Sequence, residues 1–223
     1  MVNLLFIATL ALCVVEWVAV FMDWKAARII TKPAPMVALI FWFTFEGQWM
    51  GPLMWFGAAL VFSLAGDIFL LMQKRFFIPG LVMFLLAHIC YIIGFTDRSL
   101  PINWISLVIF AAVAVAAFFD LRPVFRSLGK DEEGKAMLRP VAFYGSFLAL
   151  MVVSALFNFL RPEWHLVPAL LTAIGALLFG VSDSVLARVK FMNAGRLAHT
   201  LEMVAYLSAQ VLIAYGVLMQ YVV

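Results

Sequence analysis

Two aspartates lie inside segments that are apolar enough to cross a membrane. Asp67 lies in LVFSLAGDIFLL and Asp183 lies in ALLFGVSDSVLA. An ionisable side chain in the hydrocarbon core costs at least ~2.5 kcal/mol on insertion scales, so such a residue usually faces the interior of a helix bundle and marks a functional site. Two carboxyl groups held close together tend to divide into a protonated acid and an ionised base. The two aspartates therefore predict acid–base chemistry inside the membrane.

Other polar side chains recur at helical spacing within apolar segments. His88 and Tyr91 share one face of a helix, and Glu202, Tyr206 and Gln210 share one face of another. A polar stripe on an apolar helix lines a cavity or seals against a neighbouring helix. Both interpretations stay open for His88, Tyr206 and Gln210, which are candidates to support the aspartates or to hold helices together.

The remaining titratable residues do not predict a metal centre. Glu16 lies in the first apolar segment, where it either serves the site or pairs with a basic residue at the membrane interface. His88 lies within a span, whereas His165 and His199 lie near opposite ends of theirs. A zinc centre needs several ligands close together, so we expect no metal and no other cofactor. A metal held by one histidine and several carboxylates is the alternative. The sequence contains no GxSxG, HExxH or P-loop motif.

Composition places the chain among membrane proteins. Of its 223 residues, 66% are hydrophobic and 12% are charged, whereas soluble domains have about 45–50% apolar and about 25% charged residues. Long unbroken apolar runs predict an all-α bundle, because a helix satisfies its own backbone hydrogen bonds in lipid. The net charge of +3 fits loops at a membrane surface and excludes a nucleic-acid partner. Cys13 and Cys90 are expected to be small core residues.

Eight transmembrane helices are expected, each close to the ~20 residues that a bilayer requires. The first apolar segment has no positively charged start, so we interpret it as a span and not as a cleaved signal. The second helix can begin early, because Thr31, Lys32 and Pro33 resemble a helix start. The expected spans are 3–22, 34–45, 52–72, 77–96, 103–119, 140–160, 165–186 and 200–221.

Basic residues alternate between the connections and predict an orientation. The first, third, fifth and seventh connections carry 13 of the 15 Lys and Arg residues, and Arg98 and Arg161 are the other two. Because positively charged connections stay in the cytoplasm, we expect both termini on the non-cytoplasmic side. A bacterial inner membrane is the expected location.

The chain is expected to form a single transmembrane domain made of two similar halves. Residues 1–119 and 140–223 would be the half-repeats, and the polar segment 120–139, which contains GKDEEGK, would be a solvated cytoplasmic linker. Each half holds an even number of spans, so a duplication gives a parallel repeat about an axis along the membrane normal.

Matched residues in the two halves support the duplication. Lys32 precedes a proline at the start of the second helix, and Arg139 does so at the start of the sixth. Asp67 follows Gly66 in the third helix, and Asp183 follows Ser182 in the seventh. Both aspartates lie within two turns of cytoplasmic basic residues, at ~1.5 Å per residue. We therefore expect the two carboxylates at one depth, near the cytoplasmic face.

The ordered set of motifs resembles the YhhN/lysoplasmalogenase family of integral membrane proteins. The matching segments are LVFSLAGDIFLL, FFIPGLVMFLLAHICYIIGF, GALLFGVSDSVLA and YLSAQVLIAYG, together with the Lys-Pro before the second helix. The resemblance implies hydrolysis of the vinyl ether bond of lysoplasmalogens, which releases a fatty aldehyde and glycerophospho-ethanolamine or -choline. The residues that it carries over are Lys32, Gly66, Asp67, Gly80, His88, Tyr91, Ser182, Asp183, Tyr206 and Gln210.

The candidate residues suit this reaction. Vinyl ether hydrolysis protonates the β-carbon, and water then attacks the oxocarbenium ion, so it requires a proton donor and a carboxylate that stabilises the cation. We expect Asp67 and Asp183 to share these functions, and the lysophospholipid to enter from the bilayer with its head group toward Lys32 and Arg139. Glu202 is a supporting candidate on the pattern of its helix alone.

Two other classes of protein fit the same pattern. Parallel repeats and intramembrane acids also occur in proton-coupled transporters, although here the acids lie near one face and not at the midplane. A lipid-binding membrane protein without catalysis is the third candidate. Release of aldehyde from a lysoplasmalogen separates the first function from both others.

Overall fold

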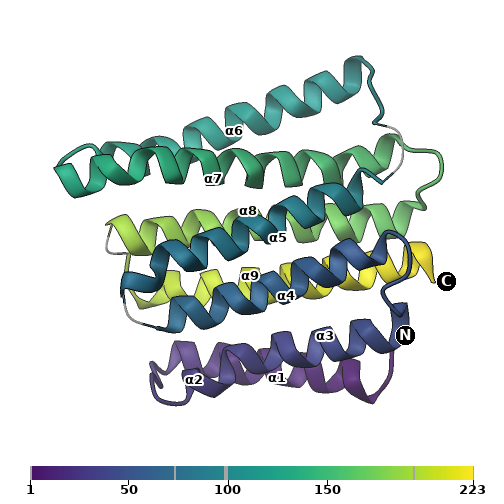
Figure 1. The fold of residues 1–223 in the computed structure, drawn as a ribbon, viewed down its shortest axis with the longest axis horizontal. Coiled ribbons are helices and arrows are strands. Elements are labelled where there is room, and N and C mark those ends of the chain that lie inside the picture. The colour runs from purple at the N-terminus through teal and green to yellow at the C-terminus, as the bar shows by residue number, and fades with distance from the viewer. Residues whose placement is uncertain (1, 73, 98–99, 193, 223) are drawn as a thin grey trace.

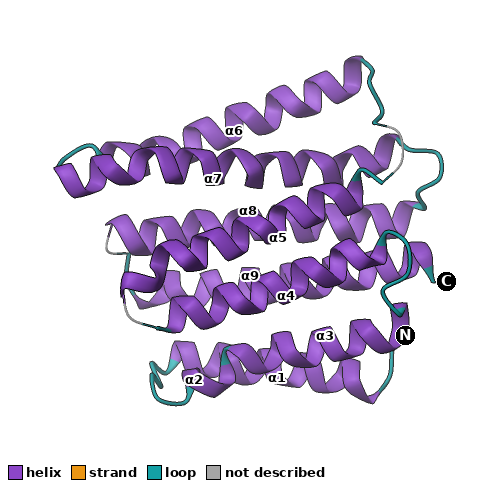
Figure 2. Ribbon diagram, in the orientation of Figure 1, coloured by secondary structure: helices purple, strands orange, loops and turns teal. Residues whose placement is uncertain are grey.

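The computed structural model describes residues 2–72, 74–97, 100–192 and 194–222. All regular secondary structure among the described residues is helical, with loops between the helices and no strand (Figure 2). The elements in chain order are α1 (Leu4–Phe21), α2 (Arg28–Thr31), α3 (Pro33–Gly47), α4 (Leu53–Leu71), η1 (Lys74–Phe76), α5 (Phe77–Phe95), α6 (Trp104–Leu128), α7 (Glu132–Leu156), η2 (Phe157–Leu160), α8 (Leu166–Met192) and α9 (Arg196–Tyr221).

The expected number of spans is confirmed. Eight helices among the described residues are long and apolar enough to cross a membrane, with α2 and α3 forming one span over Arg28–Gly47. The early start of the second span follows from Pro33, which lacks an N–H that the first helical turn would leave unpaired in any case. The protein is therefore an integral membrane protein with an all-α fold.

The helices pack side by side, with α4, α5, α8 and α9 in the centre (Figure 1). Helices α1 and α3 lie on one side of this centre, and α6 and α7 lie on the other. Burial follows the same order, because 67% of the most apolar window of α9 is buried and only 6% of that of α6. Helix α6 therefore presents most of its surface to lipid.

Small residues allow the central helices to approach closely. A Cβ atom at Gly66 would lie 2.6 Å from the ring of Phe84 on α5, and one at Gly175 would lie 3.0 Å from the carbonyl oxygen of Ala209 on α9. Membrane helices without a hydrophobic driving force between them depend on such contacts. Gly66 directly precedes Asp67, so this contact also helps to position Asp67.

The polar segment 120–139, which was predicted to be a solvated cytoplasmic linker, is mostly helical, and its place in the cytoplasm stays a prediction. Helix α6 continues to Leu128 and α7 begins at Glu132, so only residues 129–131 connect them. Asp131 caps α7 by accepting a hydrogen bond from the N–H of Gly134 at 2.6 Å. Polar composition shows that a segment leaves the hydrocarbon, but a well-capped helix continues into water.

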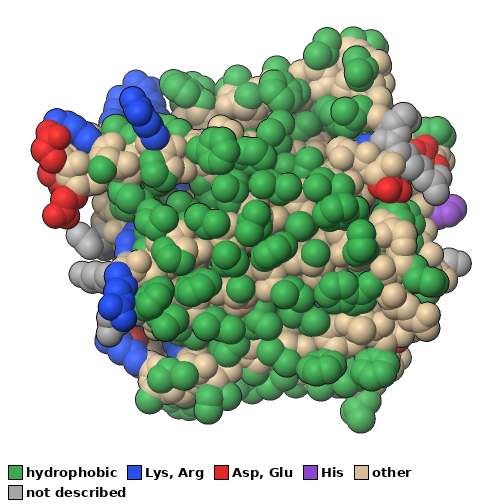
Figure 3. Space-filling model, viewed as in Figure 1, with side chains coloured by type: hydrophobic (Ala, Val, Ile, Leu, Met, Phe, Trp, Pro, Cys, Tyr) green, Lys and Arg blue, Asp and Glu red, His purple; other side chains and the backbone are tan. Residues whose placement is uncertain are grey.

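Basic side chains gather at one end of the bundle (Figure 3). This basic end carries α2 and the connections from α4 to α5, from α6 to α7 and from α8 to α9, whereas both termini lie at the opposite end (Figure 1). The expected orientation relative to the cytoplasm stays a prediction. Arg98 and the side chain of Lys74, which entered that prediction, lie outside the described part of the structure.

Candidate active site

Asp183 is held by two aromatic side chains from different helices. The hydroxyl of Tyr144 on α7 donates to Oδ2 of Asp183 on α8 at 2.5 Å. Nε2 of His88 on α5 lies 3.3 Å from the same oxygen and 3.1 Å from the Tyr144 hydroxyl. His88 and Tyr144 are buried, and Asp183 is 9% exposed. A carboxyl, a phenol and an imidazole within hydrogen-bond distance can exchange protons, so this trio can perform general acid–base chemistry.

Asp67 lies in a second buried group. The Tyr206 hydroxyl on α9 donates to Oδ2 of Asp67 at 2.7 Å, and Nζ of Lys32 lies 3.4 Å from Oδ1. Lys32 was expected to face the lipid head group, but it is buried, because its side chain turns inward to this carboxylate. Removing one partner of such an ion pair leaves an uncompensated charge, which is strongly destabilising.

Phe179 lies between the two aspartate groups. Its ring packs edge-on against His88, with centroids 4.9 Å apart, and against Tyr206, with centroids 5.6 Å apart. In the described part of the chain no hydrogen bond or ion pair joins Asp67 to Asp183; each has its own partners. A shared function of the two carboxylates therefore stays a prediction.

Tyr91 and Gln210 form a further buried contact between α5 and α9. The Tyr91 hydroxyl donates to Oε1 of Gln210 at 2.5 Å. Nε2 of Gln210 and Nδ1 of His88 are both buried without a hydrogen-bond partner in the protein. This hydrogen bond thus joins α5 to α9. His88 lies one turn before Tyr91 on α5, and Tyr206 lies one turn before Gln210 on α9.

A cavity of about 490 Å³ reaches the first group between α5, α6, α7 and α8. Asp183 and Tyr144 contribute to its wall, which is otherwise mostly apolar. Gly180, one turn before Asp183, also lines it, and a Cβ atom there would contact only Val152, at 3.8 Å. Asp67 is not among the lining residues. Of the two aspartates, Asp183 is thus the one that a molecule in this cavity can contact.

An apolar groove of about 410 Å³ between α6 and α7 adjoins the cavity. The two share Val113, Ala117, Leu121, Gly145 and Ala149. Because α6 has little buried surface, this groove lies at the lipid-facing side of the bundle. Cavity and groove together suit a long hydrocarbon chain with one polar reacting group.

Of the predicted site residues, all of which lie in the described part of the chain, Asp183 alone lines this cavity. The positions of the remaining three, Ser182, Arg139 and Glu202, are as follows. Ser182 is buried but does not line it, and Arg139 is exposed on α7, so it does not repeat the inward contact of Lys32. Glu202 is buried with its Oε2 3.0 Å from Nδ1 of His199. Arg139 was expected at the start of a helix, but α7 begins seven residues earlier, at Glu132, and Arg139 lies on an exposed part of that helix.

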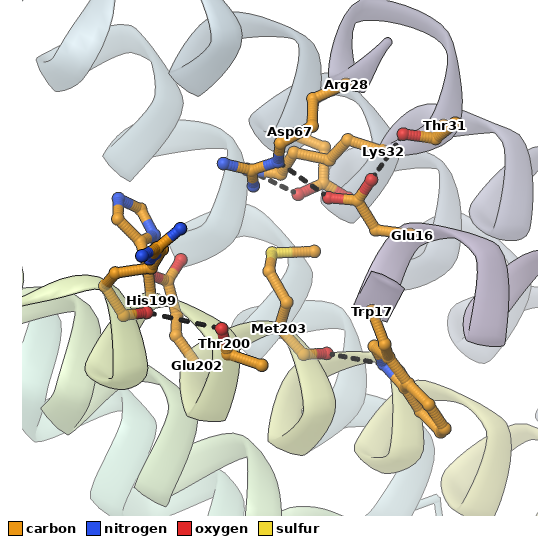
Figure 4. Close-up of polar contacts among 11 residues, drawn as sticks. Glu16, Trp17, Arg28, Thr31, Lys32, Asp67, His199, Thr200, Glu202 and Met203 are labelled. Atoms are coloured by element: carbon orange, nitrogen blue, oxygen red, sulfur yellow. Dashed lines mark hydrogen bonds and ion pairs between the residues drawn. The ribbon is translucent and has the colours of Figure 1, made fainter. Parts of the chain in front are cut away.

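Glu16 follows the interfacial alternative. Its carboxylate receives hydrogen bonds from Nε of Arg28 at 3.0 Å and from the Thr31 hydroxyl at 2.6 Å. Figure 4 draws this group beside Lys32 and Asp67. The structure shows no cluster of three or more metal-ligating side chains among the described residues.

Sequence reasoning missed Tyr144 as a member of the site. The residue lies four positions after Pro140 in the expected sixth span, and it was not weighed there. Its signal would have been a lone tyrosine within an apolar segment, where a hydroxyl requires a partner. Asp120, Ser184 and Arg188, which line the same cavity, were missed because their segments were assigned to connections or to a helix end.

The described residues form eight helices that can span a membrane, and four of these helices line an apolar cavity beside a buried carboxyl, phenol and imidazole group; together they define a polytopic membrane protein with a candidate site inside the bundle. The chain belongs to the YhhN family, whose model matches residues 27–217. This confirms the resemblance found in the motifs.

Several curated relatives carry the same name. The chain is 30% identical over 197 residues to Lysoplasmalogenase TMEM86B of Homo sapiens, which covers 88% of this chain and 77% of the human protein. It is 30% identical over 176 residues to Lysoplasmalogenase of Mycobacterium bovis, covering 77% of this chain and 60% of that protein. It is 31% identical over 158 residues to Lysoplasmalogenase TMEM86A of Bos taurus, covering 70% of this chain and 61% of that protein. No solved structure shows a significant match.

Proposed function

We propose that this protein is an intramembrane lysoplasmalogenase. It is a hydrolase that cleaves the vinyl ether bond of a lysoplasmalogen and releases a fatty aldehyde and glycerophospho-ethanolamine or -choline. The observation that carries the proposal is the apolar cavity of about 490 Å³ whose wall contains Asp183 and Tyr144. Membership of the YhhN family and the names of the relatives support the same conclusion.

The trio of Asp183, Tyr144 and His88 can carry the proton transfers. The carboxylic acid of Asp183 gives its proton to the β-carbon of the vinyl ether, and the electrons of the double bond form the new C–H bond. Water adds to the resulting oxocarbenium ion and returns a proton to the carboxylate, which stabilises the cation in the meantime. The hemiacetal then collapses to aldehyde and alcohol. His88 and Tyr144 hold the carboxyl group in position throughout.

The two aspartates divide their functions in this proposal. Asp183 reaches the cavity and contacts the substrate, whereas Asp67 neutralises Lys32 and joins α4 to α9 through Tyr206. The expected acid–base pair becomes one reacting carboxyl group and one that stabilises the bundle. Phe179 separates them.

The substrate enters from the bilayer and not from water. A lysophospholipid has a single chain, and the groove between α6 and α7 is apolar and continuous with the cavity through five shared residues. Ligand sites of this kind bury most of an apolar ligand and use few polar groups to orient it.

Filling the cavity tests the proposal. The purified protein in lipid nanodiscs is expected to release aldehyde from a defined lysoplasmalogen. Gly180→Leu places a side chain in the cavity beside Asp183, where a Cβ has room, and it is expected to abolish at least nine tenths of this activity. Ala112→Leu adds a similar side chain to an exposed position of α6 outside the cavity, and it should leave activity unchanged.

Two results would contradict this function. If the wild-type protein binds lysoplasmalogen but releases no aldehyde, it is a lipid-binding protein without catalysis. If Gly180→Leu elutes as a monodisperse protein and keeps full activity, the reaction takes place outside this cavity.

A further inference from the structure

We propose that Arg188, positioned by Asp120 and Ser184, binds the phosphate of the lysophospholipid where the cavity approaches the basic end of the bundle. This inference rests on the proposed function and names the group that selects a phospholipid over an uncharged vinyl ether. All three residues line the same cavity as Asp183. Among the described residues of that cavity wall, Arg188 alone carries a positive charge.

The guanidinium of Arg188 is held in a fixed position. Nη2 donates to Oδ1 of Asp120 on α6 at 2.6 Å and to its carbonyl oxygen at 3.3 Å, and Nη1 donates to the carbonyl oxygen of Ser184 at 3.0 Å. The Ser184 hydroxyl donates to Oδ2 of Asp120 at 2.5 Å, which orients that carboxylate in turn. The cluster therefore joins α6 to α8 across the end of the cavity.

The guanidinium retains donors for an anion. A guanidinium has five N–H groups, and three of those of Arg188 serve Asp120 and Ser184. About a third of the side chain is exposed, so part of it is open to an approaching anion. A guanidinium that is already oriented can donate its free N–H groups singly to phosphate oxygens, as charge-assisted hydrogen bonds.

The distance along α8 matches the substrate. Arg188 follows Asp183 by five residues, which is a rise of about 7.5 Å at 1.5 Å per residue. In a lysoplasmalogen, six single bonds join the vinyl ether carbon next to oxygen to the phosphorus, which gives about 7 Å in an extended chain with bonds of about 1.5 Å. A phosphate at Arg188 thus leaves the vinyl ether beside Asp183.

The cluster takes the position that was first expected for Lys32 and Arg139. Lys32 is buried against Asp67, and Arg139 is exposed on α7 outside the cavity. Neither can contact a phosphate whose vinyl ether reaches Asp183 through this cavity. Arg188 lies at the same end of the bundle, and it lines the cavity.

Two substrates that differ only in the phosphate test the assignment. The wild-type protein, Arg188→Gln and Arg126→Gln are compared on a lysoplasmalogen and on the corresponding uncharged 1-alkenylglycerol. Arg188→Gln is expected to lower kcat/KM for the phospholipid roughly 10- to 100-fold, mainly through KM, because hydrogen bonds to a charged group are lost. Its kcat/KM for the alkenylglycerol should change less than about threefold. Arg126 is exposed near the end of α6 outside the cavity, so Arg126→Gln removes the same charge without effect on either substrate.

A binding measurement separates this inference from the proposed function. A non-hydrolysable alkyl lysophospholipid is titrated into each protein, and Arg188→Gln alone should bind it more weakly. If the wild type binds it in this Arg188-dependent way but releases no aldehyde from either substrate, the phosphate site stands and the proposed function fails. If Arg188→Gln loses activity equally on both substrates and binds the lipid normally, Arg188 is structural and the inference fails.

Inorganic phosphate distinguishes a lipid head group from a free anion. It lacks the chain that fills the cavity, so it is not expected to inhibit at concentrations at which the alkyl lysophospholipid inhibits strongly. Equal inhibition by both would assign a free-phosphate site and overturn the lipid assignment.

Discussion

At the residue scale, the two aspartates that first indicate function differ in their surroundings. Asp183 contacts Tyr144 and His88 and lines a cavity. Asp67 pairs with Lys32 and does not line that cavity. Similar local sequence therefore gives one carboxyl group that can meet substrate and one that balances a buried charge.

Asparagine substitutions should separate the two. Asp183→Asn keeps the shape of the side chain and removes its titratable proton, so kcat for aldehyde release should fall ~10²–10⁴-fold with little change in stability. The measurement is initial rates on protein that elutes as a single species in detergent. Near-wild-type aldehyde release by Asp183→Asn would exclude it as the proton donor.

Asp67→Asn is the matched comparison. It leaves Lys32 buried without its counter-ion, so we expect a loss of about 3–5 kcal/mol of stability, measured by denaturant unfolding in detergent. The double variant with Lys32→Met should recover much of that loss, because the uncompensated charge is gone. A stable Asp67→Asn protein with a kcat as low as that of Asp183→Asn would restore the shared acid–base mechanism.

At the scale of the elements, the helices that hold each aspartate come from opposite halves of the chain. Asp67 on α4 is bound by Tyr206 on α9, and Asp183 on α8 is bound by His88 on α5. Each aspartate thus lies on the third span of one half and contacts the fourth span of the other, as a parallel repeat would require. The duplication itself stays a prediction, since Lys32 is buried and its expected counterpart Arg139 is exposed.

The contact between α6 and α7 should determine which chain lengths are accepted. Ala149 on α7 lines both the cavity and the adjoining groove, so Ala149→Leu shortens the space for the hydrocarbon chain. Discrimination in an apolar pocket reaches 10- to 200-fold per methylene, and we expect kcat/KM for long-chain lysoplasmalogens to fall roughly tenfold more than for short-chain ones. Competition between two chain lengths in one assay measures this ratio. An unchanged ratio would show that the hydrocarbon chain of the substrate does not lie between α6 and α7.

At the scale of the whole molecule, both termini lie at one end of the bundle and the basic connections gather at the other (Figures 1 and 3). Positive connections stay in the cytoplasm, so Arg188 and its cluster should face the cytoplasmic leaflet. The substrate would then be drawn from that leaflet.

A reporter at the C-terminus tests this orientation. A phosphatase that is active only in the periplasm should be active there, because the C-terminus lies opposite the basic end (Figure 1). A reporter that is active only in the cytoplasm, fused at the same position, is the control and should stay inactive. The reverse result would show that the protein has the opposite orientation in the membrane, with the phosphate site at the outer leaflet.

The class of protein, the number of membrane spans and the two candidate aspartates could all be predicted from the sequence. Long apolar runs and their length are local properties, so they indicate eight membrane-spanning helices without knowledge of packing, and the described residues form eight such spans. An acid within such a run is equally visible, because an ionisable side chain in hydrocarbon is costly and therefore rare unless it has a function or a partner. The helical extensions into 120–139 were missed, because polarity marks the edge of the bilayer and not the end of a helix.

Only the tertiary structure decided which of these residues act together. Side chains from α5, α7 and α8 meet at Asp183, and those from α6 and α8 meet at Arg188, although more than 60 residues separate Asp120 from Ser184 in the chain. Such contacts depend on how the helices pack, which in turn depends on small residues such as Gly66 and Gly175 that let particular faces approach. Periodicity shows that a face is polar, but packing alone determines whether that face meets a cavity, a charge or lipid.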